Sequence, residues 1–107
     1  MTYGLTDQDL TQMRAAMAQF PEIAEVILFG SRAKGNYKPG SDVDLAIKGD
    51  NVSHATVYRL ADLLNEEYPF PYFFDVIDYN SIEEPDLTDH INRVGIAIFP
   101  RETSNHG

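Results

Sequence analysis

Residues 30–45 read G-S-R-A-K-G-N-Y-K-P-G-S-D-V-D-L and form the most informative segment of the sequence. It follows a short β-branched and apolar segment, residues 25–29, which is typical of a buried strand. A strand that runs into Gly30 and Ser31 and then into a helical turn directs backbone N–H groups outward, where they can hold phosphate oxygens. Gly30 lacks a Cβ, so a phosphate can approach the backbone closely. Ser31 adds a hydroxyl donor and Lys34 a positive charge, so the junction predicts a phosphate site.

The end of this stretch predicts a second strand over residues 42–48 with two carboxylates on one face. Because side chains alternate along a strand, Asp42 and Asp44 point to one side and the apolar residues between and after them to the other. Two carboxylates in so small a space repel each other unless a cation lies between them. Hard divalent ions such as Mg²⁺ take oxygen ligands of this kind together with substrate phosphates.

A third carboxylate is expected on a further strand, residues 72–79, which read Y-F-F-D-V-I-D-Y. Asp75 stands in the middle of this apolar run, and we expect it to be buried, which is costly for a carboxylate unless it is paired or binds a metal. With Asp42 and Asp44 it would complete a two-metal site, in which one ion activates the attacking oxygen and the other steadies the leaving group. Asp78 is the competing candidate, but its opposite parity and its place near the strand end favour Asp75.

Helical periodicity and capping signals predict the elements around these strands. The first predicted helix runs from the N-cap Thr6 to Pro21, the second from the N-cap Ser53 to Tyr68 and Pro69, and a short third helix ends at Gly95. A last strand is expected over residues 96–99. These elements form a single domain over residues 1–100, and a frayed polar tail is expected over residues 101–107.

The composition of the 107-residue chain indicates one globular domain. The sequence has no cysteine, which excludes disulfides and thiolate chemistry. The formal net charge is −9, so nucleic-acid binding is not expected as its main task. No apolar run approaches the ~18 residues that span a membrane, and a soluble, cytoplasmic protein is expected.

The charges are unevenly distributed along the chain. From residue 51 to residue 90 the only basic residue is Arg59, so this acidic stretch suits a partner with a basic surface. A local positive site on an acidic protein suits a small anion, such as a nucleotide phosphate, better than a polymer. A chance cluster on a solvated loop is the alternative for the four basic residues that fall in one stretch, which are Arg32, Lys34, Lys38 and Lys48.

The order Gly-Ser, ten residues, then Asp-x-Asp resembles the signature of the DNA polymerase beta superfamily of nucleotidyltransferases. The strand around Asp75 is similar to the strand that carries the third carboxylate of that family. Over roughly residues 20–100 the chain resembles a minimal nucleotidyltransferase (MNT) domain. The resemblance implies an α/β (α+β) fold, in which helices pack on a small mixed β-sheet of three to four strands.

The resemblance also implies a role for the carboxylates and for the phosphate site. Asp42 and Asp44 would hold two Mg²⁺ ions, and Asp75 would help to bind the catalytic ion and deprotonate the acceptor hydroxyl. Gly30 and Ser31 would cradle the triphosphate of ATP. The reaction would be attack of a hydroxyl on the α-phosphate, which transfers AMP and releases pyrophosphate.

Three further residues receive roles of their own. Lys34 occupies the position where relatives place a cation on the phosphates. Arg32 either faces the nucleotide or braces the loop through a salt bridge, and both roles stay open. His90 is expected to be a partly buried structural residue or a surface group rather than a base.

The resemblance further implies that the acceptor belongs to another chain, because only a short tail follows Pro100. MNT proteins of this length act as antitoxins that adenylylate a tyrosine on a helical HEPN-type partner. A two-chain transferase acting on a small molecule, with a separate substrate-binding protein, is the second reading. A third reading is a non-catalytic antitoxin that only masks its partner, but such a protein does not need the three carboxylates Asp42, Asp44 and Asp75.

Overall fold

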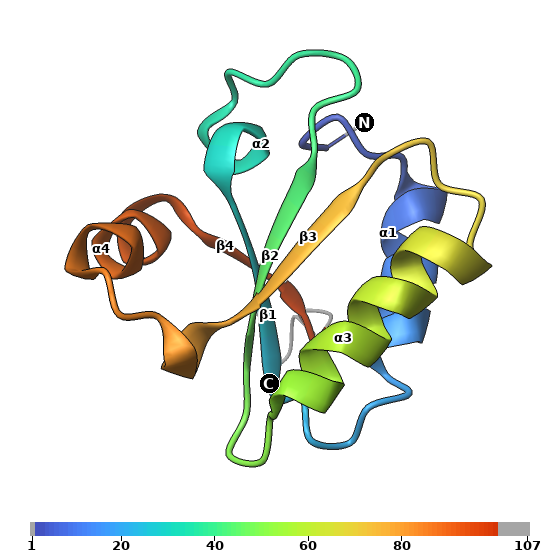
Figure 1. Ribbon diagram of the computed structural model, residues 1–107. Coiled ribbons are helices and arrows are strands. Elements are labelled where there is room, and N and C mark those ends of the chain that lie inside the picture. The colour runs from blue at the N-terminus through green and yellow to red at the C-terminus, as the bar shows by residue number, and fades with distance from the viewer. Residues whose placement is uncertain (1, 101–107) are drawn as a thin grey trace, which may run out of the picture.

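Helices alternate with the strands of one sheet along the chain (Figure 1). The computed structural model describes residues 2–100, and the tail expected over residues 101–107 lies outside the described residues. The elements follow in the order α1 (Asp7–Met17), β1 (Glu25–Phe29), α2 (Gly30–Lys34), β2 (Val43–Lys48), α3 (His54–Asp62), the π-helical turn η1 (Leu63–Glu67), β3 (Phe74–Asp78), the 3-10 turn η2 (Tyr79–Ser81), α4 (Pro85–Val94) and β4 (Ile96–Phe99).

The sheet has four strands in the order β3-β2-β1-β4. β1 runs antiparallel to both of its neighbours, β2 and β4, whereas β2 and β3 run parallel. A parallel pair needs a long crossover connection, and α3 with η1 provides it. The sheet is therefore mixed and the fold is α+β, which confirms the predicted fold class.

Both faces of the sheet are covered, and β2 shows the pattern most clearly. α1 and α3 lie on one side of the sheet and α4 on the other (Figure 1). Val43, Leu45 and Ile47 are fully buried in the core cluster that includes residues of α1 and α3. Ala46 points to the opposite face, where it packs in the cluster that contains Ile91 of α4. The predicted alternation along this strand is confirmed, and it directs Asp44 to the α4 side.

Side-chain caps fix where the first two predicted helices begin. At α1 the Thr6 Oγ1 accepts a hydrogen bond from the Asp9 N–H (2.9 Å), and the Thr6 N–H donates to the Asp9 carboxylate (3.1 Å). Ser53 and Thr56 form the same reciprocal arrangement at α3. These bonds satisfy backbone donors that a helix start leaves open, and they confirm both predicted N-caps.

The end of the last helix agrees with the prediction, and the end of the helix before it does not. The second helix was expected to continue regularly to Tyr68, but α3 ends at Asp62 and widens into η1. Gly95 does end α4, although with an extended backbone (φ −64°) and not in the left-handed conformation. A Cβ at Gly95 would collide with the Ile91 carbonyl and with Ile27 of β1. The glycine is therefore required by close packing of α4 on the sheet.

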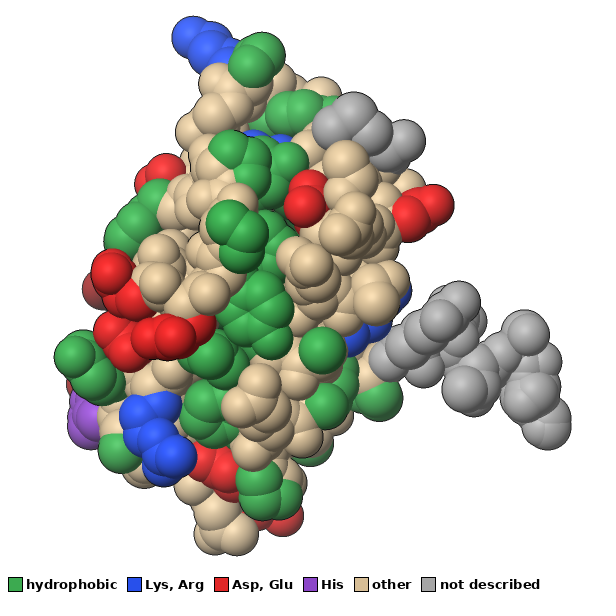
Figure 2. Space-filling model, turned by 90° about the vertical axis from the view of Figure 1, so that its right-hand side faces the viewer, with side chains coloured by type: hydrophobic (Ala, Val, Ile, Leu, Met, Phe, Trp, Pro, Cys, Tyr) green, Lys and Arg blue, Asp and Glu red, His purple; other side chains and the backbone are tan. Residues whose placement is uncertain are grey.

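The surface carries both exposed hydrophobic groups and acidic groups. Figure 2 shows the side with α1 and α3, where a band of hydrophobic side chains reaches the surface and acidic side chains lie on both sides of it. Tyr58 of α3 is 70% exposed. Among residues 2–100 no helix has both the length and the apolar character needed to cross a membrane.

Candidate active site

Phe29, Asp44 and Asp75 lie in one row across three neighbouring strands. Asp44 is opposite Phe29 in the antiparallel pair β1–β2 and opposite Asp75 in the parallel pair β2–β3. Asp42 precedes β2 directly, and α2 begins at Gly30, directly after Phe29. The fold thus brings the three predicted carboxylates to one end of β2 and β3, beside the predicted phosphate site.

The electrostatic environment of Asp44 reflects this clustering. Burial raises the pKa of Asp44 above its ordinary value, and the negative charges of Asp75 and Asp42 raise it further. The Arg32 guanidinium acts in the opposite direction, with a smaller effect. Like charges this close destabilise each other's ionised forms. The cluster is therefore one that a bound cation would relieve.

Asp75 is exposed, so the expectation that it is buried is wrong. β3 is an edge strand and is shorter than the predicted strand over residues 72–79. Phe74 and Val76 point into the core, which turns Phe73 and Asp75 to the opposite face, where Phe73 is 58% exposed. At this end of β3 that face is open to solvent, because α4 packs on β1 and α2. An exposed carboxylate does not need a metal to offset burial. Burial is therefore no reason to assign Asp75 as a metal ligand, and only its position beside Asp44 supports that role.

Gly30 is held against Asp44 in a conformation that favours glycine. Its φ is +76°, in the left-handed region, and a Cβ at this position would collide with the Asp44 carboxylate oxygen Oδ2. Ser31 follows half-buried, and Lys34 is exposed one turn further along α2. Close approach to the backbone thus places the predicted phosphate cradle directly beside the carboxylates.

His90 contacts this cradle, which the sequence did not reveal. The Gly30 N–H donates a hydrogen bond to Nε2 of His90 (3.3 Å), and the imidazole packs edge-on against Phe29 with ring centroids 6.2 Å apart. The two residues are 60 positions apart in the sequence. His90 was expected to be a partly buried structural residue or a surface group; it is half-buried, and it also touches the predicted phosphate cradle. No local pattern could have indicated this contact between α4 and α2.

Arg32 points away from solvent and is only 2% exposed. Its Nε and Nη2 donate to the Ser41 carbonyl (3.1 and 2.7 Å), and its Nη1 donates to the Tyr3 carbonyl (2.9 Å). The guanidinium also lies over the rings of Tyr37 (5.3 Å) and Tyr72 (4.8 Å). Of the two roles left open, these contacts describe bracing of the loop before Asp42. Within residues 2–100 the brace consists of carbonyl bonds and aromatic contacts, and no salt bridge to Arg32 is formed.

The four basic residues that cluster in the sequence do not form one site. Lys48 lies at the far end of β2, where it contacts the Tyr79 ring (4.3 Å) and Glu25 (3.9 Å). Arg32 is engaged by backbone carbonyls. Lys34 at the end of α2 and Lys38 in the loop that follows it are both exposed. An extended strand advances by about 3.3 Å per residue. Lys48 is therefore carried away from the other three basic residues by the length of β2.

The described residues do not present a ready metal site. Within residues 2–100 no three side chains of Asp, Glu, His or Cys are gathered closely enough to hold a metal ion. The donor set is nevertheless of the right chemistry, because Asp42, Asp44 and Asp75 are hard oxygen ligands. Burial, and then the charges of Asp75 and Asp42, raise the pKa of Asp44. These residues therefore fit a divalent cation by ligand type, although their side chains are not arranged around one.

The chain belongs to the family described as polymerase beta nucleotidyltransferases, whose model matches residues 11–104. The resemblance indicated by the Gly-Ser and Asp-x-Asp pattern is thereby confirmed, and the chain is a nucleotidyltransferase by family. No curated protein sequence matches it.

Several solved structures share its fold. A chain of a toxin–antitoxin structure with AMP-PNP is 20% identical, with a TM-score of 0.68 over 89% of this chain and 73% of that one. A chain of an MntA–HepT toxin–antitoxin structure is 17% identical, with a TM-score of 0.66 over 88% and 72%. A third structure, a tri-AMPylated Shewanella oneidensis HEPN toxin in complex with an MNT antitoxin, gives 17% identity and a TM-score of 0.58 over 84% and 71%. At these identities the similarity establishes the common fold.

Proposed function

We propose that this chain transfers AMP from ATP to a hydroxyl of a separate HEPN-type protein and acts as the antitoxin of that protein. The observation that carries the proposal is the row of Asp44 and Asp75 on β2 and β3, with Asp42 ahead of it and Gly30 pressed against Asp44. A nucleotide triphosphate held at Gly30 would have its phosphates beside three carboxylates. Carboxylates beside the phosphates are the ligand type that cation-assisted nucleotidyl transfer uses.

Asp42, Asp44 and Asp75 would hold divalent cations, which we propose to be two Mg²⁺ ions. When bound, such ions neutralise charge on the triphosphate and make the acceptor hydroxyl easier to deprotonate. Burial is the main cause of the raised pKa of Asp44, and binding of the ions would offset the part that comes from repulsion by Asp75 and Asp42.

The chain's own groups would orient the phosphates. The Gly30 N–H, the Ser31 hydroxyl and the Lys34 ammonium are donors on the first turns of α2, and each can bind a phosphate oxygen. Because the Gly30 N–H donates to His90 in this structure, the phosphate would take over that bond. Positioning of this kind contributes much of the catalysis in phosphoryl-group chemistry.

The transfer step would form a bond between the acceptor oxygen and the α-phosphorus of ATP. The bond from that phosphorus to the oxygen bridging to the β-phosphate breaks, and pyrophosphate leaves with the electron pair. The hydroxyl proton passes to the Asp75 carboxylate, which is exposed and hence reachable by an acceptor on another molecule. A tyrosine hydroxyl of the partner is the proposed acceptor.

The partner is proposed from the relatives and from the openness of the site. Structures with the same fold include a toxin–antitoxin with AMP-PNP and an AMPylated HEPN toxin bound to an MNT antitoxin. Asp42 and Asp75 are both exposed, so a large acceptor can reach them. A free small-molecule acceptor is the alternative, to be separated by experiment.

The test is a labelling assay with purified components. The chain is co-expressed and purified with a candidate HEPN-type partner, then incubated with α-³²P-labelled ATP and Mg²⁺. We expect the label on the HEPN-type protein, and no label with Asp44→Asn or with EDTA. Label recovered only in a small molecule would favour the two-chain transferase, and a bound but unlabelled partner would favour masking without catalysis.

A further inference from the structure

The outer edge of β3 carries backbone groups that do not take part in the sheet. The Val43 N–H donates to the Phe73 carbonyl (2.9 Å), so the backbone groups of Phe73 face β2. Because backbone direction alternates along a strand, Asp75 and Ile77 also face β2. Phe74, Val76 and Asp78 therefore present their N–H and C=O groups to the free edge.

Asn65 satisfies the first of these outward pairs. The Phe74 N–H donates to Asn65 Oδ1 (2.8 Å), and Asn65 Nδ2 donates to the Phe74 carbonyl (3.0 Å). A primary amide used in this way replaces the peptide group of a neighbouring strand. At the opposite edge of the sheet, the Ile98 carbonyl of β4 accepts a hydrogen bond from Arg14 Nε (2.8 Å). Both edges are thus partly closed by side chains, as sheet edges in native proteins commonly are.

Val76 is the next residue after Phe74 whose backbone N–H and C=O face the free edge, and within the described residues these two groups are unpaired. None of the hydrogen bonds among residues 2–100 outside the strand ladders involves the Val76 N–H or C=O. Val76 itself is only 8% exposed. An unpaired backbone pair at a sheltered position costs free energy that a hydrogen-bonding ligand would recover.

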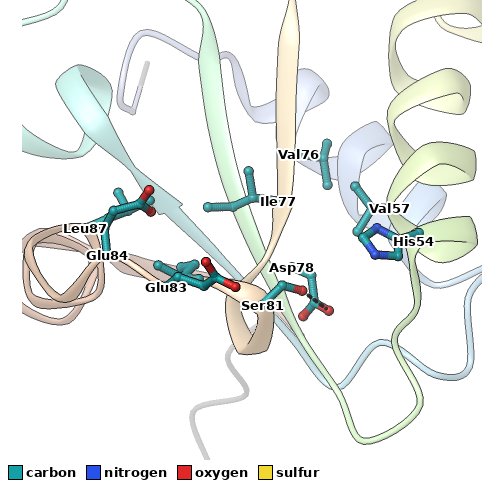
Figure 3. Close-up of a pocket in the computed structure, with 10 residues that line it drawn as sticks. His54, Val57, Val76, Ile77, Asp78, Ser81, Glu83, Glu84 and Leu87 are labelled. Carbon is teal, nitrogen blue, oxygen red and sulfur yellow. Dashed lines mark hydrogen bonds between the residues drawn. The ribbon is translucent and has the colours of Figure 1, made fainter.

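A groove lies over this open pair. It encloses about 410 Å³, and Val76, Ile77 and Asp78 of β3 line it. His54 and Val57 of α3 form one wall, and the segment from Ser81 to Leu87 forms the other (Figure 3). The strand edge thus runs between two walls, a shape that suits an extended chain.

The charge of the groove indicates which kind of chain would fit. Glu83 and Glu84 are exposed on one wall, and within the described residues neither takes part in a salt bridge. Val57, Ile82 and Leu87 add apolar surface beside them. An extended segment with alternating basic and apolar side chains would match this lining, because its side chains point alternately to opposite sides.

We propose that this groove is a strand-docking site for a basic, extended segment of the protein partner. The segment would pair with the Val76 N–H and C=O and so add a fifth strand beside β3, the mode known as β-augmentation. The inference rests on the proposed function for the existence of that partner. Asp75 directly precedes Val76, so a docked segment would anchor the partner beside the proposed catalytic carboxylates without covering β2.

Amide hydrogen exchange on the unmodified complex tests the docking directly. The Val76 N–H should exchange quickly in the free chain and at least about tenfold more slowly in the complex with the HEPN-type protein, because a new hydrogen bond protects it. A complex in which the Val76 N–H keeps its free exchange rate would overturn the proposal. Protection that appears without the partner and grows with protein concentration would assign the edge to a second copy of this chain, and would also overturn it.

A matched pair of variants isolates the backbone donor. Val76→Pro removes the outward N–H while leaving the bonds to β2 in place, and proline is tolerated at such edge positions. Val76→Ala removes core packing but keeps the N–H. We expect Val76→Pro to weaken partner binding by about tenfold relative to Val76→Ala, measured by calorimetry. Equal affinities for the two variants would contradict the docking mode.

Charge reversal tests the choice of occupant. Glu83→Lys with Glu84→Lys should slow association by about tenfold at low salt, whereas Glu66→Lys with Glu67→Lys, an exposed pair outside the groove, should not. Equal effects of the two pairs would contradict a basic segment. AMP transfer is scored separately: transfer without Val76 protection would refute the docking site alone, and Val76 protection without transfer would refute the proposed function alone.

Discussion

The backbone N–H of Gly30 donates a hydrogen bond to Nε2 of His90, so α4 holds the first residue of the proposed phosphate cradle. The imidazole accepts this bond through its Nε2 atom. The contact connects the C-terminal helix to the strand-to-helix junction in the first half of the chain, and it explains how the peptide group of Gly30 is oriented before any nucleotide binds.

Replacement of His90 by alanine should leave the half-buried Gly30 N–H without its acceptor. We expect His90→Ala to lower the free energy of unfolding by about 1 kcal/mol, measured by urea denaturation. Thr88→Ala on the same helix is the control and should change it little. Indistinguishable stabilities of the two variants would show that the bond to Gly30 does not matter for the fold.

Gly30 and Gly35 form a natural comparison, because both have a positive φ (+76° and +87°). Alanine at either position pays the same backbone strain, about 1–2 kcal/mol. A Cβ at Gly30 also collides with the Asp44 carboxylate, whereas nothing lies within 4 Å of a Cβ at Gly35. Gly30→Ala should therefore be the less stable variant and should lose AMP-PNP binding, which Gly35→Ala should retain in calorimetry.

Asp44 predicts an unusual pH dependence of stability in EDTA. Its pKa is raised in the folded state, first by burial and then by Asp75 and Asp42. Its contribution to stability is therefore fully present below the ordinary aspartate pKa and is lost as the pH rises through the raised value. Asp44→Asn should be more stable than the parent chain at neutral pH, with a difference that closes in acid. Asp50→Asn, in an exposed loop, should show no such difference in urea titrations across the same pH range.

Arg32 should be essential for stability, since its guanidinium is buried and donates to two backbone carbonyls. Lysine cannot reproduce the several N–H donors of the planar guanidinium or its contacts with the rings of Tyr37 and Tyr72. We expect Arg32→Lys to lower the free energy of unfolding by about 2–4 kcal/mol. Arg59→Lys, at an exposed position, is the control and should change it little. A stable Arg32→Lys variant that fails to bind AMP-PNP would instead support a direct role at the nucleotide.

The alternation of β2 and the helix caps could be predicted because they depend on neighbours in the sequence. Val43, Leu45 and Ile47 follow the period of a strand, and Thr6 and Ser53 act on residues three positions away. The exposure of Asp75 could not be predicted, since it depends on β3 being an edge strand with one open face.

Contacts between segments that are distant in the sequence could not be predicted either. His90 reaches Gly30 because α4 packs over β1 and α2. Asn65 pairs with Phe74 because η1 returns to the sheet edge. Lys48 seemed to belong to the basic cluster, but the length of β2 carries it to the far end of the sheet. In each case tertiary packing, and not local pattern, decides what the side chain meets.

The intact mass of the proposed HEPN-type partner, measured after incubation with this chain, ATP and Mg²⁺, shows directly whether AMP is transferred. AMP transfer predicts that the partner gains the mass of one AMP for each modified hydroxyl, and that the gain disappears when Asp44→Asn replaces the parent chain. Modified tyrosines would then be located by fragmentation. A partner that binds the chain yet keeps its original mass, or that gains AMP equally with Asp44→Asn, would contradict the assignment of Asp42, Asp44 and Asp75 as the centre of nucleotidyl transfer.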